Sequence, residues 1–399
     1  MSISRKKWQK EFIKKVFAQK TKNNEFTDIV LDDICLLNSK NKYLPKTLYK
    51  FYKTTSENIL DIKNKKLWLS HPSTFNDPYD CSIGYNEVEY EKKYLIEAIE
   101  KNGLIGANGT DVITEEEYIE LCNSCVNGEE WYLFSSKKGY YETFRKITDK
   151  KTEVLNNKLQ KIRRYAINDA KQKIDNIRNT NIRVACFSAE KLHDTYYVSP
   201  TNHECLSKIQ MWSHYTNNHK GFCVEYDMSS IKRDTTFNYS FSDFFSVSSK
   251  DKYLAERLSA TIKGGLFPVI YTSKRVNIPY KKLKKYKLDE RNDIIDILYN
   301  AYITKSTMWS YENEWRLIVD ESVSGYYNNK IPFPYAKKIY LGCKMDKNNI
   351  DELMNIADEI GAEIQFMNME SNKFDLFEMA PYPYKFNEER RLNSNPYKN

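Results

Sequence analysis

Two acidic residues one position apart, Glu312 and Glu314, are the side chains in the sequence best suited to chemistry. Every second residue from 315 to 319 is a large apolar one, which is the period of a half-buried strand. Because residues i and i+2 of an extended chain share one face, we expect both carboxylates to project together, with Arg316 behind them. This arrangement suits acid–base chemistry or the stabilisation of a cation, and it is equally typical of a salt-bridged sheet surface.

Glycosyl-bond chemistry is the reaction that such a pair would serve. One carboxylate at a strand edge could bind a ribose hydroxyl and stabilise an oxocarbenium-like centre. Neighbouring aromatic residues, which include Trp309 and Tyr311, would offer flat apolar surface for a base or a nicotinamide ring. An alternative interpretation needs no ligand, because Glu314 could form an ion pair with Arg316 or with Lys305 across a sheet.

Common cofactor and metal motifs are missing from the sequence. It contains no GxGxxG, no GxxxxGK[ST] and no GxSxG. The C-x-x-C pair, Cys122 and Cys125, has no second pair at zinc spacing, and His214 and His219 are five residues apart rather than four. We therefore predict no metal site.

Composition narrows the class of protein. Of the 399 residues, 41% are hydrophobic and 14% aromatic, which is typical of a folded chain with a sizeable core. The net charge of +8 permits an anionic partner, such as a nucleotide or nucleic acid, without requiring one. The eight scattered cysteines indicate reduced thiols of a cytoplasmic protein, and no apolar run is long enough for a membrane span. The oligomeric state is not predictable from these features.

Hydrophobic periodicity and turn residues predict the elements that would position the pair. We expect strands at 48–52, 67–70, 182–188, 222–227, 267–272, 338–343 and 362–369, and helices at 55–62, 206–215 and 348–360. The basic run at 281–287 is predicted to be a solvated loop or a phosphate-contacting edge. Five segments follow: an amino-terminal basic amphipathic arm (1–42), a first core half (43–85), an all-helical insertion (86–181), a second core half (182–345), and a final helix and strand (346–399).

Three blocks of the sequence resemble a family of uncharacterised bacterial domains often met in defence islands. The blocks are LWLSHPSTFNDPYD at residues 67–80, MWSHY with KGFCVEY at 211–226, and WSYENEWRLI at 309–318. At greater distance, the layout is similar to the ADP-ribosyltransferase fold, in which a Glu-x-Glu opens a late strand. The resemblance implies an α+β protein with a mixed, split sheet and NAD bound between two small sheets.

The same resemblance implies roles for particular residues. Glu314 would stabilise the transition state on the nicotinamide ribose, and Glu312 would orient an acceptor, which could be a protein or a nucleic acid. The first strand carries Lys50 and Tyr52 where the fold has His or Arg. The residues expected to hold the dinucleotide are Lys50, Tyr52, Ser70, Asn76, Asp77, Ser188, Trp212, His214, Tyr215 and Arg316. An alternative function is a non-catalytic module that binds a nucleotide or nucleic acid, and Trp212, His214 and Tyr215 could equally be core residues.

Overall fold

A computed structural model describes most of the chain and divides it into two compact units. The described residues are 5–18, 26–94 apart from 88 and 92, 164–177, 182–190, 206, 208–229, 231, 249–286 and 294–379. The first unit comprises Met1–Thr74, Asn181–Tyr271 and Thr307–Asn399, and the second comprises Phe75–Thr180 and Thr272–Ser306. Each unit therefore joins segments that are remote in the sequence, and the five consecutive segments expected above stay a prediction.

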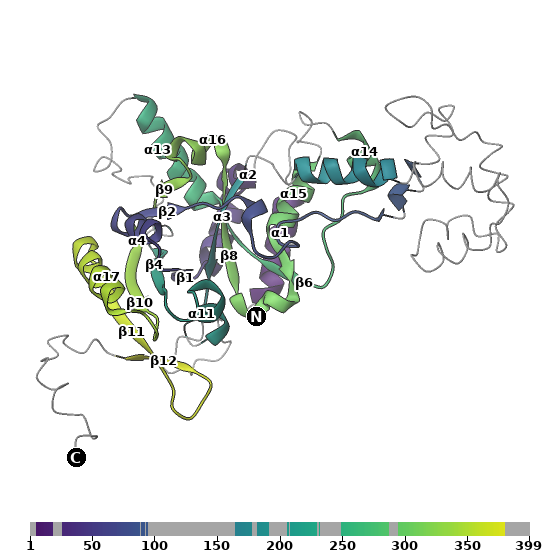
Figure 1. The fold of residues 1–399 in the computed structure, drawn as a ribbon. Helices are drawn as coiled ribbons and strands as arrows, with labels where there is room; N and C mark the ends of the chain where they lie inside the picture. The colour runs from purple at the N-terminus through teal and green to yellow at the C-terminus, as the bar shows by residue number, and fades with distance from the viewer. Residues whose placement is uncertain are drawn as a thin grey trace, which may run out of the picture. The chain divides into compact units, whose positions relative to one another are not determined.

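An eight-stranded sheet is the frame of the first unit (Figure 1). Its order is β12 (Leu376–Met379), β11 (Glu363–Met369), β10 (Ala336–Leu341), β4 (Phe222–Asp227), β1 (Thr47–Tyr52), β3 (Ile182–Ser188), β8 (Glu314–Asp320) and β5 (Leu266–Pro268). Only the β10–β11 pair in this sheet is parallel, so the sheet is mixed and mostly antiparallel. The expected α+β class is confirmed, and the likeness of this core to the ADP-ribosyltransferase fold stays a prediction.

Pairing is thinnest at the middle of this sheet. β3 and β8 pair along their whole length, from Ile182 opposite Asp320 to Ser188 opposite Glu314. β1 and β4 also pair along their length, whereas β1 and β3 share the single register pair Tyr49 and Ser188. The strands therefore form one continuous hydrogen-bonded sheet rather than two separate small sheets. We call the sparsely paired boundary between β1 and β3 the β1–β3 seam.

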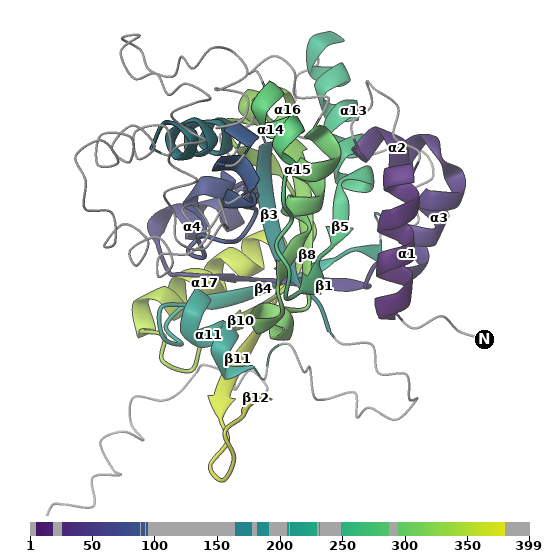
Figure 2. The same cartoon turned by 90° about the vertical axis from the view of Figure 1, so that its right-hand side faces the viewer.

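Helices cover this sheet at several places. They are α1 (Arg5–Ala18), α2 (Phe26–Asp32), α3 (Ile34–Tyr43), α4 (Ser56–Lys63), α11 (Ile209–Tyr215), α13 (Ser249–Gly264), α16 (Glu321–Ser324) and α17 (Lys347–Ile360). Figure 1 shows α17 alongside β10 and β11, and Figure 2 shows α1, α2 and α3 packed together. Short elements complete the unit: β2 (Lys66–Trp68) paired with β9 (Lys330–Pro332), η1 (Pro72–Thr74), η4 (Thr307–Glu312) and η5 (Gly325–Tyr327). β6 (Ile270–Thr272) begins in this unit and ends at the first residue of the second unit's next segment.

Local sequence explains where several of these elements begin and end. Thr55 caps α4, because its hydroxyl accepts a hydrogen bond from the Asn58 backbone N–H at 3.3 Å. Gly361 ends α17 in the left-handed conformation with φ of 76°. The apolar stripe of α1 packs on the core rather than on an outside partner: Trp8 stacks on Trp315 with ring centroids 6.3 Å apart.

The second unit contains α14 (Tyr280–Lys285), α15 (Ile295–Tyr302) and β7 (Thr304–Ser306), and its residues 164–177 are helical. Residues 95–163, where most of the all-helical insertion was expected, lie outside the described residues. The prediction of a loop at 281–287 is wrong for Lys281–Lys285, which form part of α14. Pro279 is the N-cap residue of that helix, with an extended backbone conformation and no side-chain hydrogen bond to the first turn.

Candidate functional site

The backbone between the two acidic residues differs from the expected continuous strand. η4 ends at Glu312, Asn313 has a left-handed φ of 46°, and β8 begins at Glu314. The amide Nδ2 of Asn313 donates to the carbonyls of Ala189 at 2.7 Å and Glu190 at 2.8 Å, which fastens this turn to the end of β3. The prediction that Glu312 and Glu314 project together as i and i+2 of one strand is therefore wrong, because Asn313 interrupts the extended chain.

Glu314 and Arg316 do share a strand face, and they form a buried ion pair. Arg316 Nε donates to Glu314 Oε1 at 2.7 Å and its Nη2 donates to Oε2 at 3.2 Å. The exposed fractions of the two residues are 3% and 0%. The ion pair expected as an alternative is thus present. Lys305, the other partner considered for Glu314, lies in the second unit and pairs with Asp80 at 3.3 Å.

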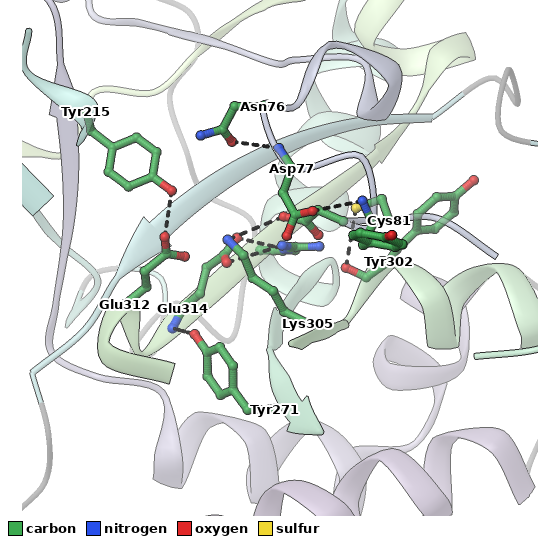
Figure 3. A network of polar contacts seen from close by, with 12 residues as sticks. Asn76, Asp77, Cys81, Tyr215, Tyr271, Tyr302, Lys305, Glu312 and Glu314 are labelled. Atoms are coloured by element: carbon green, nitrogen blue, oxygen red, sulfur yellow. Dashed lines mark hydrogen bonds and ion pairs between the residues drawn. The ribbon is translucent and has the colours of Figure 1, made fainter. Parts of the chain in front are cut away.

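Glu312 instead contacts α11. The hydroxyl of Tyr215 donates to Glu312 Oε1 at 2.6 Å, as Figure 3 shows. Glu312 is buried, with an exposed fraction of 3%, whereas Tyr215 is half-buried. A second bond joins the same two elements, because Lys208 Nζ donates to the carbonyl of Tyr311 at 2.6 Å. The MWSHY block and the ENE block are therefore in direct contact.

Lys50 lies at the seam between β1 and β3. Its Nζ donates to the carbonyl of Cys186 at 3.3 Å, and it stands over the rings of Tyr52 and Phe187 at 5.6 and 5.8 Å. Burial lowers the pKa of the Lys50 ammonium, and the nearby Cys186 and Glu314 partly offset this by favouring the charged form. Through its bond to Cys186, Lys50 joins β1 to the strand that pairs with Glu314.

Aromatic rings of α11 and η4 surround the Tyr215–Glu312 contact. His214, which is exposed, meets Trp309 edge-on with ring centroids 6.2 Å apart, and Trp309 meets Tyr311 at 6.0 Å. We call His214, Tyr215, Trp309 and Tyr311 the aromatic shelf. None of these four residues is among the fully buried side chains of the core, so they can offer flat surface to a ligand.

Trp212 and Tyr52 have structural contacts. Trp212 is fully buried, and its indole N–H donates to the carbonyl of Leu206 at 2.8 Å, so it is a core residue, as the sequence left open. The Tyr52 and Tyr226 hydroxyls share a buried hydrogen bond of 2.7 Å. Burial and Tyr226 together raise the pKa of the Tyr52 phenol well above its ordinary value. Tyr52 is therefore also held within the core.

The remaining predicted residues are divided between the two units. Ser188 is the cross-strand partner of Glu314, and Ser70 exchanges backbone hydrogen bonds with Val184 of β3. Asn76 and Asp77 belong to the second unit. They form the expected turn, in which the Asp77 carboxylate accepts from the Tyr79 backbone N–H at 2.8 Å.

Sequence reasoning missed three residues that shape the site. Asn313 fixes the turn between the two acidic residues, Lys208 ties α11 to η4, and the hydroxyl of Tyr271 accepts a hydrogen bond from the Glu314 backbone N–H at 2.8 Å. An asparagine between two acidic residues is a signal for a left-handed position, since asparagine adopts that conformation more readily than most residues. No sequence signal points to Lys208 or Tyr271, because their partners are far away in the chain.

Comparisons with known proteins give one match, to part of the chain. A family model described as a protein of unknown function (DUF2971) matches residues 211–317. That segment begins within α11 and ends within β8, so it contains both partners of the Tyr215–Glu312 hydrogen bond and of the Glu314–Arg316 ion pair. No curated protein and no solved structure matches the chain. Within the described part of the chain, no helix has the length and apolar character that crossing a membrane requires.

Proposed function

We propose that the chain is an ADP-ribosyltransferase-like enzyme that uses NAD as its substrate. The observation that carries the proposal is the position of Lys50, whose ammonium is bonded at the β1–β3 seam to the carbonyl of Cys186, on the strand that pairs with Glu314. A cation can bind the pyrophosphate of NAD, and a carboxylate can stabilise the positive charge that develops on the reacting ribose. We expect the enzyme to act in the bacterial cytoplasm. The resemblance of the three blocks implies a role in a defence system or as a toxin.

Glu314 suits the stabilisation of an oxocarbenium-like centre because its orientation is fixed. Arg316 engages both carboxylate oxygens, and Tyr271 holds the Glu314 backbone N–H. A charge that is already oriented before the reaction stabilises a developing positive charge without the cost of reorganising. The two bonds from Arg316 would keep the carboxylate pointing in one direction as nicotinamide leaves.

Lys50 and the aromatic shelf supply the binding contacts in this proposal. A lysine ammonium binds phosphate as a point charge, whereas the arginine of the resembling fold would bind it through two parallel hydrogen bonds. Lys50 can therefore replace His or Arg in attracting the pyrophosphate, with less control over its orientation. His214 and Trp309 offer ring faces for the nicotinamide or the adenine.

Release of nicotinamide from NAD tests the proposal. The wild-type protein should bind NAD and release nicotinamide, and Glu314→Gln should lose that release by at least about 100-fold, in line with the loss of a group that stabilises charge in the transition state. A matched control is Glu225→Gln, which alters another buried carboxylate of the same sheet, bonded to Tyr340 at 2.6 Å. Glu314→Gln also breaks the buried ion pair with Arg316, so urea unfolding identifies conditions under which each variant stays folded, and nicotinamide release is compared there. A wild-type protein that neither binds nor cleaves NAD would refute the proposal.

A second candidate, a nucleic-acid-binding module, draws on α14 of the second unit. This helix carries four lysines in the sequence YKKLKK, of which Lys281 and Lys285 are exposed. Lys282 and Lys284 also pair with Asp296 and Asp169 at 3.7 Å each, which reduces the net positive charge there. Affinity for single-stranded RNA that weakens with salt and with Lys281→Gln and Lys285→Gln would support this function. Affinity indifferent to salt would contradict it.

A further inference from the structure

We infer that Tyr215 and Glu312 form a nucleophile–base pair, in which the phenolic oxygen of Tyr215 accepts the ADP-ribosyl group of NAD. This inference rests on the proposed function, because it requires that NAD is cleaved beside Glu314. It goes further in naming a covalent acceptor within the chain itself. The reasons lie in the geometry of the contact, in the burial of the base and in the short path to Glu314.

The contact has the geometry of an activated nucleophile. Such pairs are recognised by a hydroxyl within about 2.6–3.2 Å of a base that other groups hold in place. Tyr215 donates to Glu312 Oε1 at 2.6 Å, a length typical of a charge-assisted bond between a hydroxyl and a carboxylate. The turn that carries Glu312 is held in place by the Asn313 amide, which is bonded to the carbonyls of Ala189 and Glu190.

Burial distinguishes the roles of the two partners. Glu312 has an exposed fraction of 3%, and the half-buried phenol of Tyr215 is the partner with more access to solvent. A buried carboxylate is costly unless it is hydrogen-bonded. The contact between α11 and η4 does not depend on a buried carboxylate, because Lys208 already joins the two elements by donating to the carbonyl of Tyr311. A base that is shielded from water and bonded to a reachable hydroxyl is the arrangement that nucleophilic catalysis uses.

The reacting carbon would lie close to this pair. Glu312 and Glu314 are separated by Asn313 alone, so their Cα atoms are at most about 7.6 Å apart, given about 3.8 Å for each step along the chain. Tyr215 is bonded directly to Glu312, and Figure 3 shows its ring directed at that carboxylate, with Glu314 two residues further along the chain. The inference places the ribose carbon of NAD between the Glu314 carboxylate and the Tyr215 oxygen, which this short connection along the chain allows.

The proposed step balances without any further reactant. The bond between C1′ of the ribose and the pyridinium nitrogen of NAD breaks, and neutral nicotinamide leaves with the electron pair. A new bond forms between C1′ and the phenolic oxygen of Tyr215, while the phenolic proton passes to Glu312. Glu314 stabilises the positive charge that develops on the ribose during this exchange. No oxidation or reduction takes place.

The test uses the full-length protein and NAD labelled in its adenine moiety, with nicotinamide release measured in the same samples. We expect one label per chain, located by peptide mass spectrometry on Tyr215 and resistant to neutral hydroxylamine, which cleaves carboxylate esters but not this phenolic linkage. Tyr215→Phe and Glu312→Gln should each lower the labelling by at least about 100-fold, as removal of a nucleophile or a base does. Tyr340→Phe is the matched control, since Tyr340 donates to Glu225 at the same distance of 2.6 Å, and its labelling should equal that of the wild type.

The outcomes separate this inference from the proposed function. Nicotinamide released without a label on Tyr215, or a label that hydroxylamine removes, overturns the inference and leaves the proposed function standing. Full labelling of Tyr215→Phe overturns it in the same way. If the wild-type protein neither binds nor cleaves NAD, both fall together. Because Tyr215→Phe keeps the ring and its contact with His214, a urea midpoint equal to that of the wild type shows that any lost labelling is chemical.

Discussion

Breaking the ion pair between Arg316 and Glu314 should be among the most damaging single changes in the first unit. Both residues are almost completely buried, with exposed fractions of 0% and 3%, and two hydrogen bonds join them. Arg316→Met keeps much of the length of the side chain but leaves the carboxylate without its arginine partner. Breaking a buried pair in this way costs about 3–5 kcal/mol of the free energy of unfolding.

Removing both charges should cost less than removing one. The single variant Arg316→Met leaves a buried Glu314 carboxylate that has lost its arginine partner. The double variant Glu314→Gln/Arg316→Met removes that buried charge as well. We expect the double variant to be more stable than Arg316→Met by about 1–3 kcal/mol, the range of coupling energies between contacting residues. Arg183→Met is the control, because Arg183 pairs with Glu321 at 2.7 Å but with side chains that are 16% and 37% exposed. That partly exposed pair should contribute no more than about 1 kcal/mol.

Urea unfolding followed by tryptophan fluorescence measures these differences. Five of the six tryptophans, Trp8, Trp68, Trp212, Trp309 and Trp315, belong to the first unit, so the signal reports mainly on that unit. The two units can unfold separately, and the midpoints should be taken from the transition that the fluorescence follows. A loss below about 1 kcal/mol for Arg316→Met, or a double variant less stable than Arg316→Met, would refute the reasoning, given the usual cost of stranding a buried charge.

Two further predictions concern stability. Burial, with a smaller contribution from Lys263, lowers the pKa of the Lys40 amine to about 7, so the folded state disfavours its protonated form. The unfolded chain then binds more protons between pH 7 and about 10, where an unfolded lysine titrates. Wild-type stability should therefore rise with pH across that window, by about 1.4 kcal/mol for each unit of pKa difference. Lys40→Met should reduce this slope, leaving the part that Lys50 contributes, and Lys14→Met, at an exposed position of α1, should keep the whole of it. Equal slopes in all three proteins in urea titrations would contradict the assignment. Gly361→Ala meets no atom within 4 Å but keeps the left-handed φ of 76°, so strain alone should cost about 1–2 kcal/mol. Gly325→Ala, at a helical φ of −63°, should change the thermal midpoint little, and equal effects at the two glycines would be evidence against the strain argument.

The sequence was sufficient for elements whose signals are local. β8, β1, α4 and α17 were predicted within a few residues, because alternation, capping residues and a terminal glycine all lie within the elements themselves. The pairing of Glu314 with Arg316 was also foreseeable from the strand period. The lysine-rich α14 was not, because charge and solvation at that run favour a loop and a short helix equally.

Long-range features of the candidate site were beyond the sequence. The direction of Glu312 depends on the left-handed Asn313 and on Tyr215, which is 97 residues away in the chain. The bond from Lys50 to Cys186 spans 136 residues and depends on the register between β1 and β3. A shift of one residue in that register would place other side chains beside Glu314, and local periodicity does not determine it.

The seam between β1 and β3 also has a consequence for the order in which the chain can fold during synthesis. β1 and β4 pair along their length and are complete once residue 227 has been made, whereas β3 waits for β8 and is joined to β1 only at Tyr49 and Ser188. Until β8 is made, one edge of β3 presents unpaired backbone groups, a state that favours pairing with other chains. Late pairing of distant strands is also intrinsically slow. The carboxylates and their partners therefore come together only in the last part of synthesis, so an unfinished chain carries none of the proposed activity.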